Sequence, residues 1–185
     1  MRARSPRPVG IAAAAFLAAL ALASSGCSST PGIVAPYVQT PTAVVTAMLR
    51  LAEVRAGDVV YDLGSGDGRV VIAAARDFGA RGVGVELEPR LVEESRALAQ
   101  RAGVADRTEF RQQDIFVTDV SAASVVALYL SPELNERLRP RLASQLRPGS
   151  RIVSHDFLMG DWKPARTITV AGPDRTHTLH LWIVP

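Results

Sequence analysis

The stretch "VVYDLGSGDGRVVIAAA", residues 59–75, constrains the fold of this chain more than any other segment. An apolar, β-branched run meets Gly64, Gly66 and Gly68, and a second apolar run with helical spacing follows at once. Because glycine takes backbone angles that are closed to other residues, the pattern predicts a strand, a tight turn and a helix. Such a unit is typical of α/β proteins with a parallel sheet.

Strand-like and helical segments alternate along the rest of the chain. We expect strands at Val59–Leu63, Gly82–Glu86, Thr108–Gln112, Val125–Leu130 and Arg151–Ser154, and helices at Arg69–Phe78, Pro89–Ala102 and Ser131–Leu146. An earlier helix should begin with Thr40 as its N-cap and Pro41 in its first position. Pro140 should kink the last of these helices.

The end of the chain has a different pattern. The runs "RTITV" and "THTLHLWIVP" are strand-like and are joined by "AGPD", which leaves no room for a helix. They should therefore pair antiparallel at the edge of the sheet. The predicted fold is α/β, a doubly wound, mostly parallel, Rossmann-like sheet with an antiparallel C-terminal strand pair.

The N-terminus has the composition of a targeting segment. Three arginines and no acidic residue precede Ile11–Ala23, an apolar run of 13 residues. This run is shorter than the ~20 residues that span a bilayer. Two kinds of processing remain open: "ALA", which ends at Ala23, fits signal cleavage, and "SSGC", which ends at Cys27, resembles a bacterial lipobox. Cys27 is the single cysteine, so an intrachain disulfide is excluded.

These features divide the chain into three parts. We expect a signal peptide or lipoprotein signal at 1–27, a Ser- and Pro-rich linker at 28–39 and a cofactor-binding domain at 40–185. The segment predicts an exported or membrane-associated bacterial protein, in the periplasm or tethered through Cys27, although a cytoplasmic location stays open. We expect the domain to be a monomer.

The positive charge of the chain lies at its N-terminus. The formal net charge is +3, and residues 1–27 hold three of the 21 basic residues and none of the 18 acidic ones. The remainder is therefore balanced in charge, which argues against a nucleic-acid partner.

The glycine turn favours one class of cofactor. Its spacing is G-x-G-x-G, whereas a dinucleotide fingerprint is G-x-G-x-x-G, and Arg69 stands at that third position. Asp62 at the end of the preceding strand would repel a pyrophosphate, but it suits a ligand that carries an ammonium group. S-adenosylmethionine carries an amino-acid tail and a sulfonium and has no phosphate. The turn therefore predicts S-adenosylmethionine as the cofactor.

Two further acids follow the next two strands. Glu86 can accept hydrogen bonds from both hydroxyls of a ribose. Asp114 stands where it could bind the adenine amino group, with Ile115 and Phe116 available to line the ring. A single acid at a strand end is more often a solvated cap. Three of them at successive strand ends around a glycine turn indicate a cofactor site.

These motifs resemble those of a known family. "YDLGSGDGR", "VGVELEP" and "QQDIF" are similar to the cofactor motifs of class I S-adenosylmethionine-dependent methyltransferases. "APYVQTP", "VVALYLSPELN", "LRPGSRIVSHDF" and "MGDW" resemble small lysine methyltransferases that act on the c subunit of ATP synthase and on the adenine nucleotide translocase. The resemblance implies transfer of a methyl group to a protein lysine or similar amine. It also implies cofactor contacts from Tyr37, Thr40 and Ser65.

The acceptor side is expected at the ends of the fourth and fifth strands. The resemblance points to Tyr129, Ser131, Asn135, His155 and Asp156 as catalytic candidates. Ser131 also reads as a helix N-cap, Tyr129 as a core residue, and His155 with Asp156 as a structural pair. We expect no metal, because His177 and His180 fall on opposite faces of a strand.

Two other functions stay open at this point. A nicotinamide oxidoreductase shares the fold but is disfavoured by the glycine spacing and by Asp62. An exported domain that binds a ligand or acts as a scaffold without catalysis would explain the N-terminal segment, because S-adenosylmethionine is made in the cytosol.

Overall fold

The computed structural model describes Met1 and residues 38–185. The first half of the domain holds α1 (Thr42–Leu51), β1 (Val59–Leu63), α2 (Arg69–Phe78), β2 (Arg81–Glu86), α3 (Pro89–Arg101) and β3 (Thr108–Gln112). A short 3₁₀ turn (Ala105–Arg107) precedes β3. The second half holds β4 (Val125–Leu128), α4 (Pro132–Gln145), β5 (Arg151–His155), β6 (Arg166–Ala171) and β7 (Thr176–Ile183).

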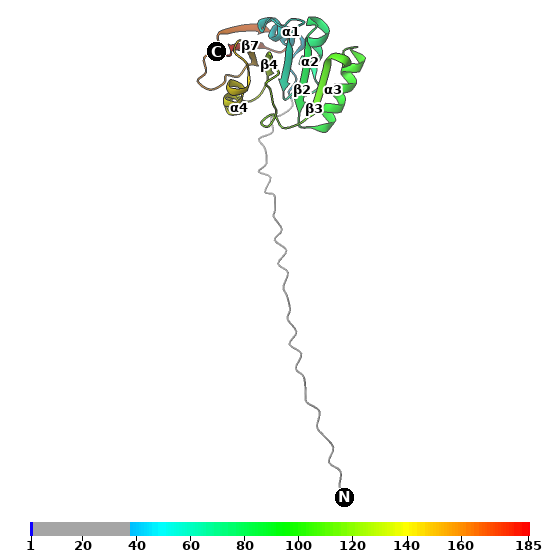
Figure 1. Ribbon diagram of the computed structural model, residues 1–185. Coiled ribbons are helices and arrows are strands. Elements are labelled where there is room, and N and C mark those ends of the chain that lie inside the picture. Colours follow the sequence, from blue (N-terminus) through cyan, green and yellow to red (C-terminus); the bar gives the residue numbers. More distant parts are fainter. Residues whose placement is uncertain (2–37) are drawn as a thin grey trace. The chain divides into compact units, whose positions relative to one another are not determined.

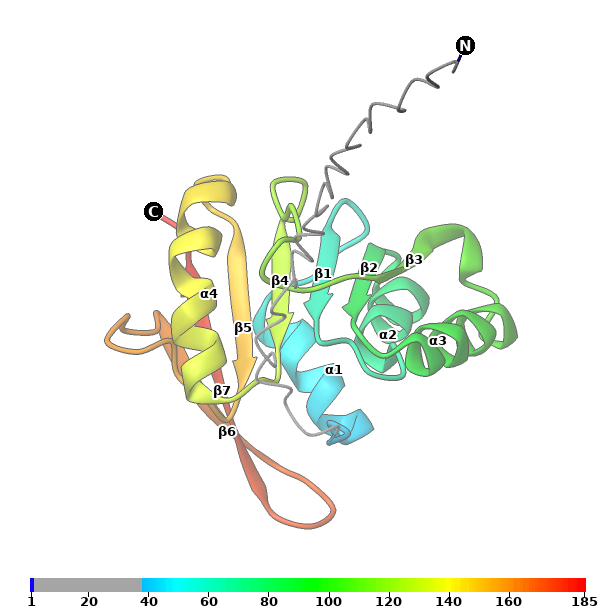
Figure 2. The same cartoon turned by 90° about the horizontal axis from the view of Figure 1, so that it is seen from below.

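The strands form one seven-stranded sheet in the order β3-β2-β1-β4-β5-β7-β6 (Figures 1 and 2). Strands β1 to β5 are parallel to their neighbours. Strand β7 is antiparallel to both β5 and β6, so the C-terminal hairpin places its second strand inside the sheet and its first strand at the edge. The predicted fold class is confirmed. Strand order reverses between β1 and β4, and ligands of doubly wound sheets bind beyond the carboxyl ends of strands at such a point.

The two faces of the sheet bury separate cores. On one face α1 and α2 pack on β1, β4, β5 and β7 through aliphatic side chains that include Val44, Leu49, Val70 and Leu179. On the other face α4 presents Leu134, Leu138 and Leu142 to a core that includes Leu63, Leu128 and Trp182. Figure 2 shows α3 beside β3 at one end of the sheet and α4 beside β5, in the other half of the sheet. This packing fixes the strand ends that carry the site.

Three local expectations were wrong or incomplete. Helix α1 begins at Thr42 with Pro41 as its N-cap, and its cap has no side-chain hydrogen bond. The Thr40 hydroxyl instead contacts His155, a residue far along the chain. Strand β4 ends at Leu128, so Tyr129 and Leu130 lie beyond it. Helix α4 continues through Pro140 to Gln145.

Within residues 38–185, no helix is long and apolar enough to cross a membrane. The predicted targeting segment at 1–27 and most of the linker lie outside the described residues.

Candidate active site

The glycine turn joins β1 to α2 with three residues in the left-handed region. The φ angles are +83° at Gly64, +53° at Gly66 and +76° at Gly68. The turn is tied to the end of β2, because the amides of Gly64 and Ser65 both donate to the Val85 carbonyl, at 2.8 and 3.0 Å. Left-handed angles are costly for residues with a side chain, so this conformation needs glycine.

The Ser65 side chain lies against β2. Among the described residues its buried hydroxyl has no hydrogen-bond partner, and an added Cβ at Gly84 would come within 2.8 Å of it. The predicted cofactor contact of Ser65 stays a prediction.

Glu86 links the glycine turn to the end of β2. Its carboxylate accepts hydrogen bonds from the amides of Gly66 (3.0 Å), Leu87 (2.8 Å) and Glu88 (3.0 Å). A carboxylate has about four acceptor sites, so one remains on the oxygen that faces Gly66. The predicted role of Glu86 as a ribose acceptor stays a prediction, and the structure adds a second role in holding the turn.

Asp62 is a buried carboxylate beside the turn. Within the described residues no group hydrogen-bonds its side chain, which is 6% exposed. Burial, with smaller effects of the charges on Glu86 and Asp67, raises the pKa of Asp62 to about 7. A cation placed beside Asp62 would relieve this unfavourable position.

Asp114 lies just beyond β3 on the exposed side of the site. One of its carboxylate oxygens accepts the Phe116 amide at 2.8 Å. The other is not engaged by any described residue, and Ile115 and Phe116 are half-buried beside it. The guanidinium of Arg137 stacks over the Phe116 ring at 3.9 Å. The predicted adenine contacts are therefore available, and they stay predictions.

The segment before α1 is held against the glycine turn. Arg69 donates to the Thr40 carbonyl at 2.9 Å and forms an ion pair with Asp67 at 2.6 Å. Gln39 also donates to Asp67, at 3.3 Å. Thr40 thus lies next to the cofactor turn, as the resemblance implied, whereas Tyr37 lies outside the described residues.

Three of the catalytic candidates, Tyr129, Ser131 and Asn135, follow the end of β4. Tyr129 is half-buried, and its ring stacks on His155 with centroids 3.9 Å apart. The Ser131 hydroxyl accepts the Leu134 amide at 3.4 Å and caps α4. Asn135 is fully buried, and its amide donates to Ser154 and to the carbonyls of Phe157 and Leu158. Asn135 therefore ties α4 to the loop after β5, and its predicted catalytic role stays a prediction.

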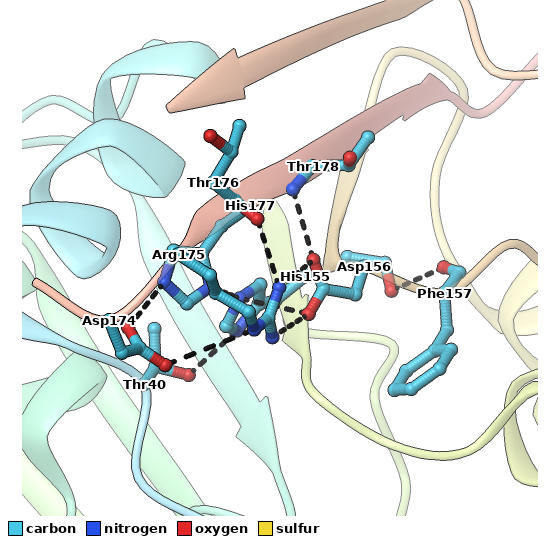
Figure 3. A network of polar contacts seen from close by, with 10 residues as sticks. Thr40, His155, Asp156, Phe157, Asp174, Arg175, Thr176, His177 and Thr178 are labelled. Carbon is cyan, nitrogen blue, oxygen red and sulfur yellow. Dashed lines mark hydrogen bonds and ion pairs between the residues drawn. The ribbon is translucent and has the colours of Figure 1, made fainter. Parts of the chain in front are cut away.

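Asp156 follows β5 in a strained backbone conformation. Its φ is +63°, which non-glycine residues adopt rarely. Its carboxylate accepts the Thr178 amide at 3.0 Å and pairs with Arg175 at 2.5 Å (Figure 3). Burial alone would raise the pKa of Asp156, but hydrogen bonds from Arg175 and Thr178 outweigh it and hold the pKa below its ordinary value. Asp156 is therefore a weak base.

His155 is fully buried behind Tyr129 and joins a line of polar groups (Figure 3). Its Nδ1 lies 3.1 Å from the Thr40 hydroxyl, and its Nε2 lies 2.8 Å from Nδ1 of His177. The nearest Asp156 oxygen is farther, 3.4 Å from Nε2. Burial, which outweighs the charge on Asp156, lowers the pKa of His155 to about 4. His155 is therefore neutral at pH 7.

Sequence reasoning missed the partners of His155. His177 and Arg175 belong to the β6–β7 hairpin, and that hairpin reaches β5 only because β7 enters the sheet between β5 and β6. The pairing of His155 with Leu179 then sets His177 nearby. The side-chain atoms of His155, Asp156 and His177 that could bind a metal all lie within 4.8 Å of one another. His180, on the same strand, contacts Thr167 instead, at 3.0 Å.

Comparison with known proteins identifies the family. The family described as the ANTKMT methyltransferase domain matches residues 62–166. A protein-lysine N-methyltransferase of Saccharolobus islandicus is 41% identical over 150 residues, which cover 80% of this chain and 93% of that protein. The chain belongs to this methyltransferase family.

Other relatives differ in length and in the acceptor that they are named for. The lysine N-methyltransferase of Xenopus laevis that is named for the c subunit of ATP synthase is 37% identical over 129 residues, which are 70% of this chain but 56% of the relative. A solved structure from Salinibacter ruber, an RNA methyltransferase in complex with S-adenosyl-L-homocysteine, is 55% identical with a TM-score of 0.77. It covers 80% of this chain and 94% of that one.

The chain is an S-adenosylmethionine-dependent methyltransferase. The residues present fit this cofactor, because the buried Asp62 carboxylate, which no described residue pairs with, calls for a cation, and an ammonium group supplies one. A pyrophosphate at the same place would meet the negative charges of Asp62, Asp67 and Glu86. Neither the nicotinamide oxidoreductase nor a binding protein without catalysis gains any support from the relatives.

Proposed function

We propose that this methyltransferase acts on lysine side chains of a protein. The observation that carries the proposal is the 41% identity to a protein-lysine N-methyltransferase across nearly the whole of that relative. Relatives named for the c subunit of ATP synthase and for the adenine nucleotide translocase, at 37% and 34% identity, support the same kind of acceptor.

The chemistry of the strand ends suits an amine acceptor. When bound, S-adenosylmethionine supplies an electrophilic methyl carbon on a sulfonium. The chain's task is to align the amine with that carbon, to keep water out and to accept a proton. Tyr129 offers an aromatic ring at the predicted acceptor side, and this ring stacks with His155 and Phe157, whose centroids lie 3.9 and 6.2 Å away. A cation can approach such a ring favourably.

An RNA acceptor is the second candidate, because the Salinibacter ruber structure carries that description. The charge of the domain weighs against it, since all of the net positive charge belongs to residues 1–27. RNA binding draws on clustered, unpaired basic side chains. Near the glycine turn Arg69 pairs with Asp67, and on α2 Arg76 pairs with Asp77 at 2.7 Å.

The two acceptors are separated by labelling. Residues 28–185 would be incubated with tritiated S-adenosylmethionine and host extract, and samples would then be split between protease and ribonuclease. We expect protease-sensitive label that amino-acid analysis identifies as methyllysine. Asp62→Asn should lose the label, whereas Asp106→Asn, an exposed carboxylate away from the site, should retain it. Label that only ribonuclease removes would establish the RNA acceptor and refute the lysine proposal.

We also propose that residues 1–27 direct this domain to a membrane or across it. The support is the run of three arginines and 13 apolar residues, followed by Cys27. A methyltransferase at a membrane would meet acceptors there, as the names of the relatives that modify ATP synthase suggest for those enzymes.

A further inference from the structure

Four side chains form a continuous hydrogen-bonded line from the cofactor turn to the surface (Figure 3). Thr40 Oγ1 lies 3.1 Å from His155 Nδ1, and His155 Nε2 lies 2.8 Å from His177 Nδ1. His177 Nε2 lies 3.2 Å from Asp174 Oδ1. The first three side chains are buried, at 6%, 0% and 2% exposure, whereas the side chain of Asp174 is 62% exposed.

The line has a defined direction. The Asp174 carboxylate only accepts, so Nε2 of His177 must donate to it. A neutral His177 then accepts at Nδ1 from Nε2 of His155, and His155 accepts at Nδ1 from the Thr40 hydroxyl. The two histidines can also take up one additional proton while all three hydrogen bonds of the line are kept. His177 then donates from both nitrogens, and His155 donates from Nδ1 to the Thr40 oxygen.

We propose that His155 and His177 relay a proton from the acceptor amine, through Thr40, to Asp174 at the surface; the inference rests on the proposed lysine acceptor. A lysine ammonium must lose a proton before its nitrogen can bond to carbon. That proton passes to Thr40 Oγ1, while the Thr40 hydroxyl proton moves to Nδ1 of His155. The Nε2 proton of His155 moves to Nδ1 of His177, and His177 releases its Nε2 proton to Asp174 and then to water.

The surroundings of the two rings support a relay. Thr40 is the inner end, because its carbonyl is held by Arg69 next to the glycine turn. The Tyr129 ring covers His155 on the site side. The charged groups that face the two histidines are Asp156, Asp174 and Arg175. Because two of them are acids and one is a base, their net negative charge stabilises a positive charge on either ring during the transfer.

The turn of the β6–β7 hairpin packs closely against the His177 ring. An added Cβ at Gly172 would come within 2.3 Å of Nε2 of His177, so the turn can close over the ring only with glycine there. The same enclosure leaves Nε2 a path to Asp174 and hence to solvent.

A metal ion fits this cluster less well than a proton does. The two nitrogens that would bind the metal lie at hydrogen-bond distance, 2.8 Å, whereas ligands about 2 Å from a tetrahedral zinc are more than 3 Å apart. The Asp156 oxygen that would complete the site is already paired with the guanidinium of Arg175.

His177→Gln tests the relay in the full-length protein. The amide fills the position but cannot pass a proton between two nitrogens. We expect single-turnover methylation of a lysine acceptor to fall about 100-fold at pH 7, as for the loss of a positioned proton acceptor. The loss should shrink about tenfold per pH unit towards the lysine pKa of about 10.4, because a free amine needs no relay. His180→Gln, on the same strand but bonded to Thr167, should match the wild type.

An equal loss at every pH, or none at pH 7, would overturn the relay while the lysine acceptor stands. If the wild-type protein methylates no lysine, the proposed function fails and the relay with it. Imidazole ¹⁵N spectra of the cofactor-free protein give a readout without activity. At pH 8 both rings should carry hydrogen on Nε2 and none on Nδ1, and equimolar Zn²⁺ should leave the signals in place. Hydrogen on Nδ1 of either ring, or zinc coordination, would overturn the proposal.

Discussion

At the scale of the residue, the buried Asp62 carboxylate destabilises the cofactor-free protein, and we expect it to stabilise the complex with the cofactor. Its pKa is about 7 in the folded chain, raised first by burial, whereas an unfolded aspartate titrates near 3.9. Between these values the folded state binds more protons than the unfolded state does. The free energy of unfolding therefore falls as pH rises from about 4 to about 7.

Asp62→Asn should remove this penalty. We expect the cofactor-free variant to be more stable than the wild type at pH 8, by on the order of 3 kcal/mol, and less so at pH 5. The same variant should bind S-adenosylmethionine at least about tenfold more weakly, because the ammonium loses its countercharge. Urea unfolding at both pH values and calorimetry measure the two effects, with Asp106→Asn as the control. If the variant is less stable than the wild type at pH 8, the buried Asp62 carboxylate does not lower the free energy of unfolding.

Asp156 also acts through charge, by neutralising Arg175 beside the acceptor side. Asparagine tolerates the positive φ, so Asp156→Asn should keep the backbone and leave the guanidinium uncompensated. We expect KM for the lysine acceptor to rise about fivefold, corresponding to ~1 kcal/mol for a partly exposed pair, while the cofactor Kd stays within twofold. Initial rates at two salt concentrations measure this effect.

High salt should reduce the rise in KM, since it screens the exposed charge. The double variant Asp156→Asn with Arg175→Gln should restore most of the acceptor affinity. A double variant that is as impaired as the single one would show that Asp156 acts in another way.

At the scale of the element, β2, β3 and the glycine turn meet where only glycine fits. Gly84 of β2 lies beside Phe110 of β3, and an added Cβ would come within 2.6 Å of the Phe110 ring and 2.8 Å of the Ser65 hydroxyl. Gly68, at the start of α2, contacts the same ring, with an added Cβ at 2.5 Å. Phe110 therefore sets the distance between the turn and the sheet.

Gly84→Ala should destabilise the domain by about 1–3 kcal/mol through overpacking, and it should weaken cofactor binding because it displaces the turn. Thermal unfolding and calorimetry measure these effects. Phe110→Leu in the same chain should recover part of the stability. Gly57→Ala is the matched control, since a Cβ there has nothing within 4 Å. If the two alanine variants are equally stable, the close packing at Gly84 does not constrain the turn.

The elements that carry the cofactor site could be predicted because their signals are local. The bounds of β1, α2 and β3 agree with the sequence prediction, and two of the three predicted acids, Asp62 and Glu86, lie beside the glycine turn. Thr40 was mistaken for an N-cap because its hydroxyl bonds to a residue 115 positions away. Likewise, His177 joins His155 only through the β5–β7 register, which no local pattern specifies.

At the scale of the whole molecule, the strand order separates the predicted cofactor residues from the predicted acceptor-side residues. The strands β1 to β3 carry the glycine turn and the predicted cofactor acids, whereas β4, β5 and the β6–β7 hairpin carry Tyr129, Asp156 and the two histidines. Because β7 lies between β5 and β6, the C-terminal hairpin places His177 beside His155, at the predicted acceptor side. The relay and the cofactor turn then meet at Thr40.

We predict that the proposed targeting segment at residues 1–27 is processed. Its apolar run of 13 residues is too short to anchor a domain by spanning a bilayer, so a stable attachment calls for lipid on Cys27. Mass spectrometry of the protein from its host should show a mature terminus at Ser24 or at a lipidated Cys27. Cys27→Ala separates the two outcomes: it should release a lipoprotein from the membrane fraction, whereas it should leave a chain cut after Ala23 unchanged. An unprocessed terminus at Met1 or Arg2 in the cytosolic fraction would refute export, and the domain would then work where S-adenosylmethionine is made.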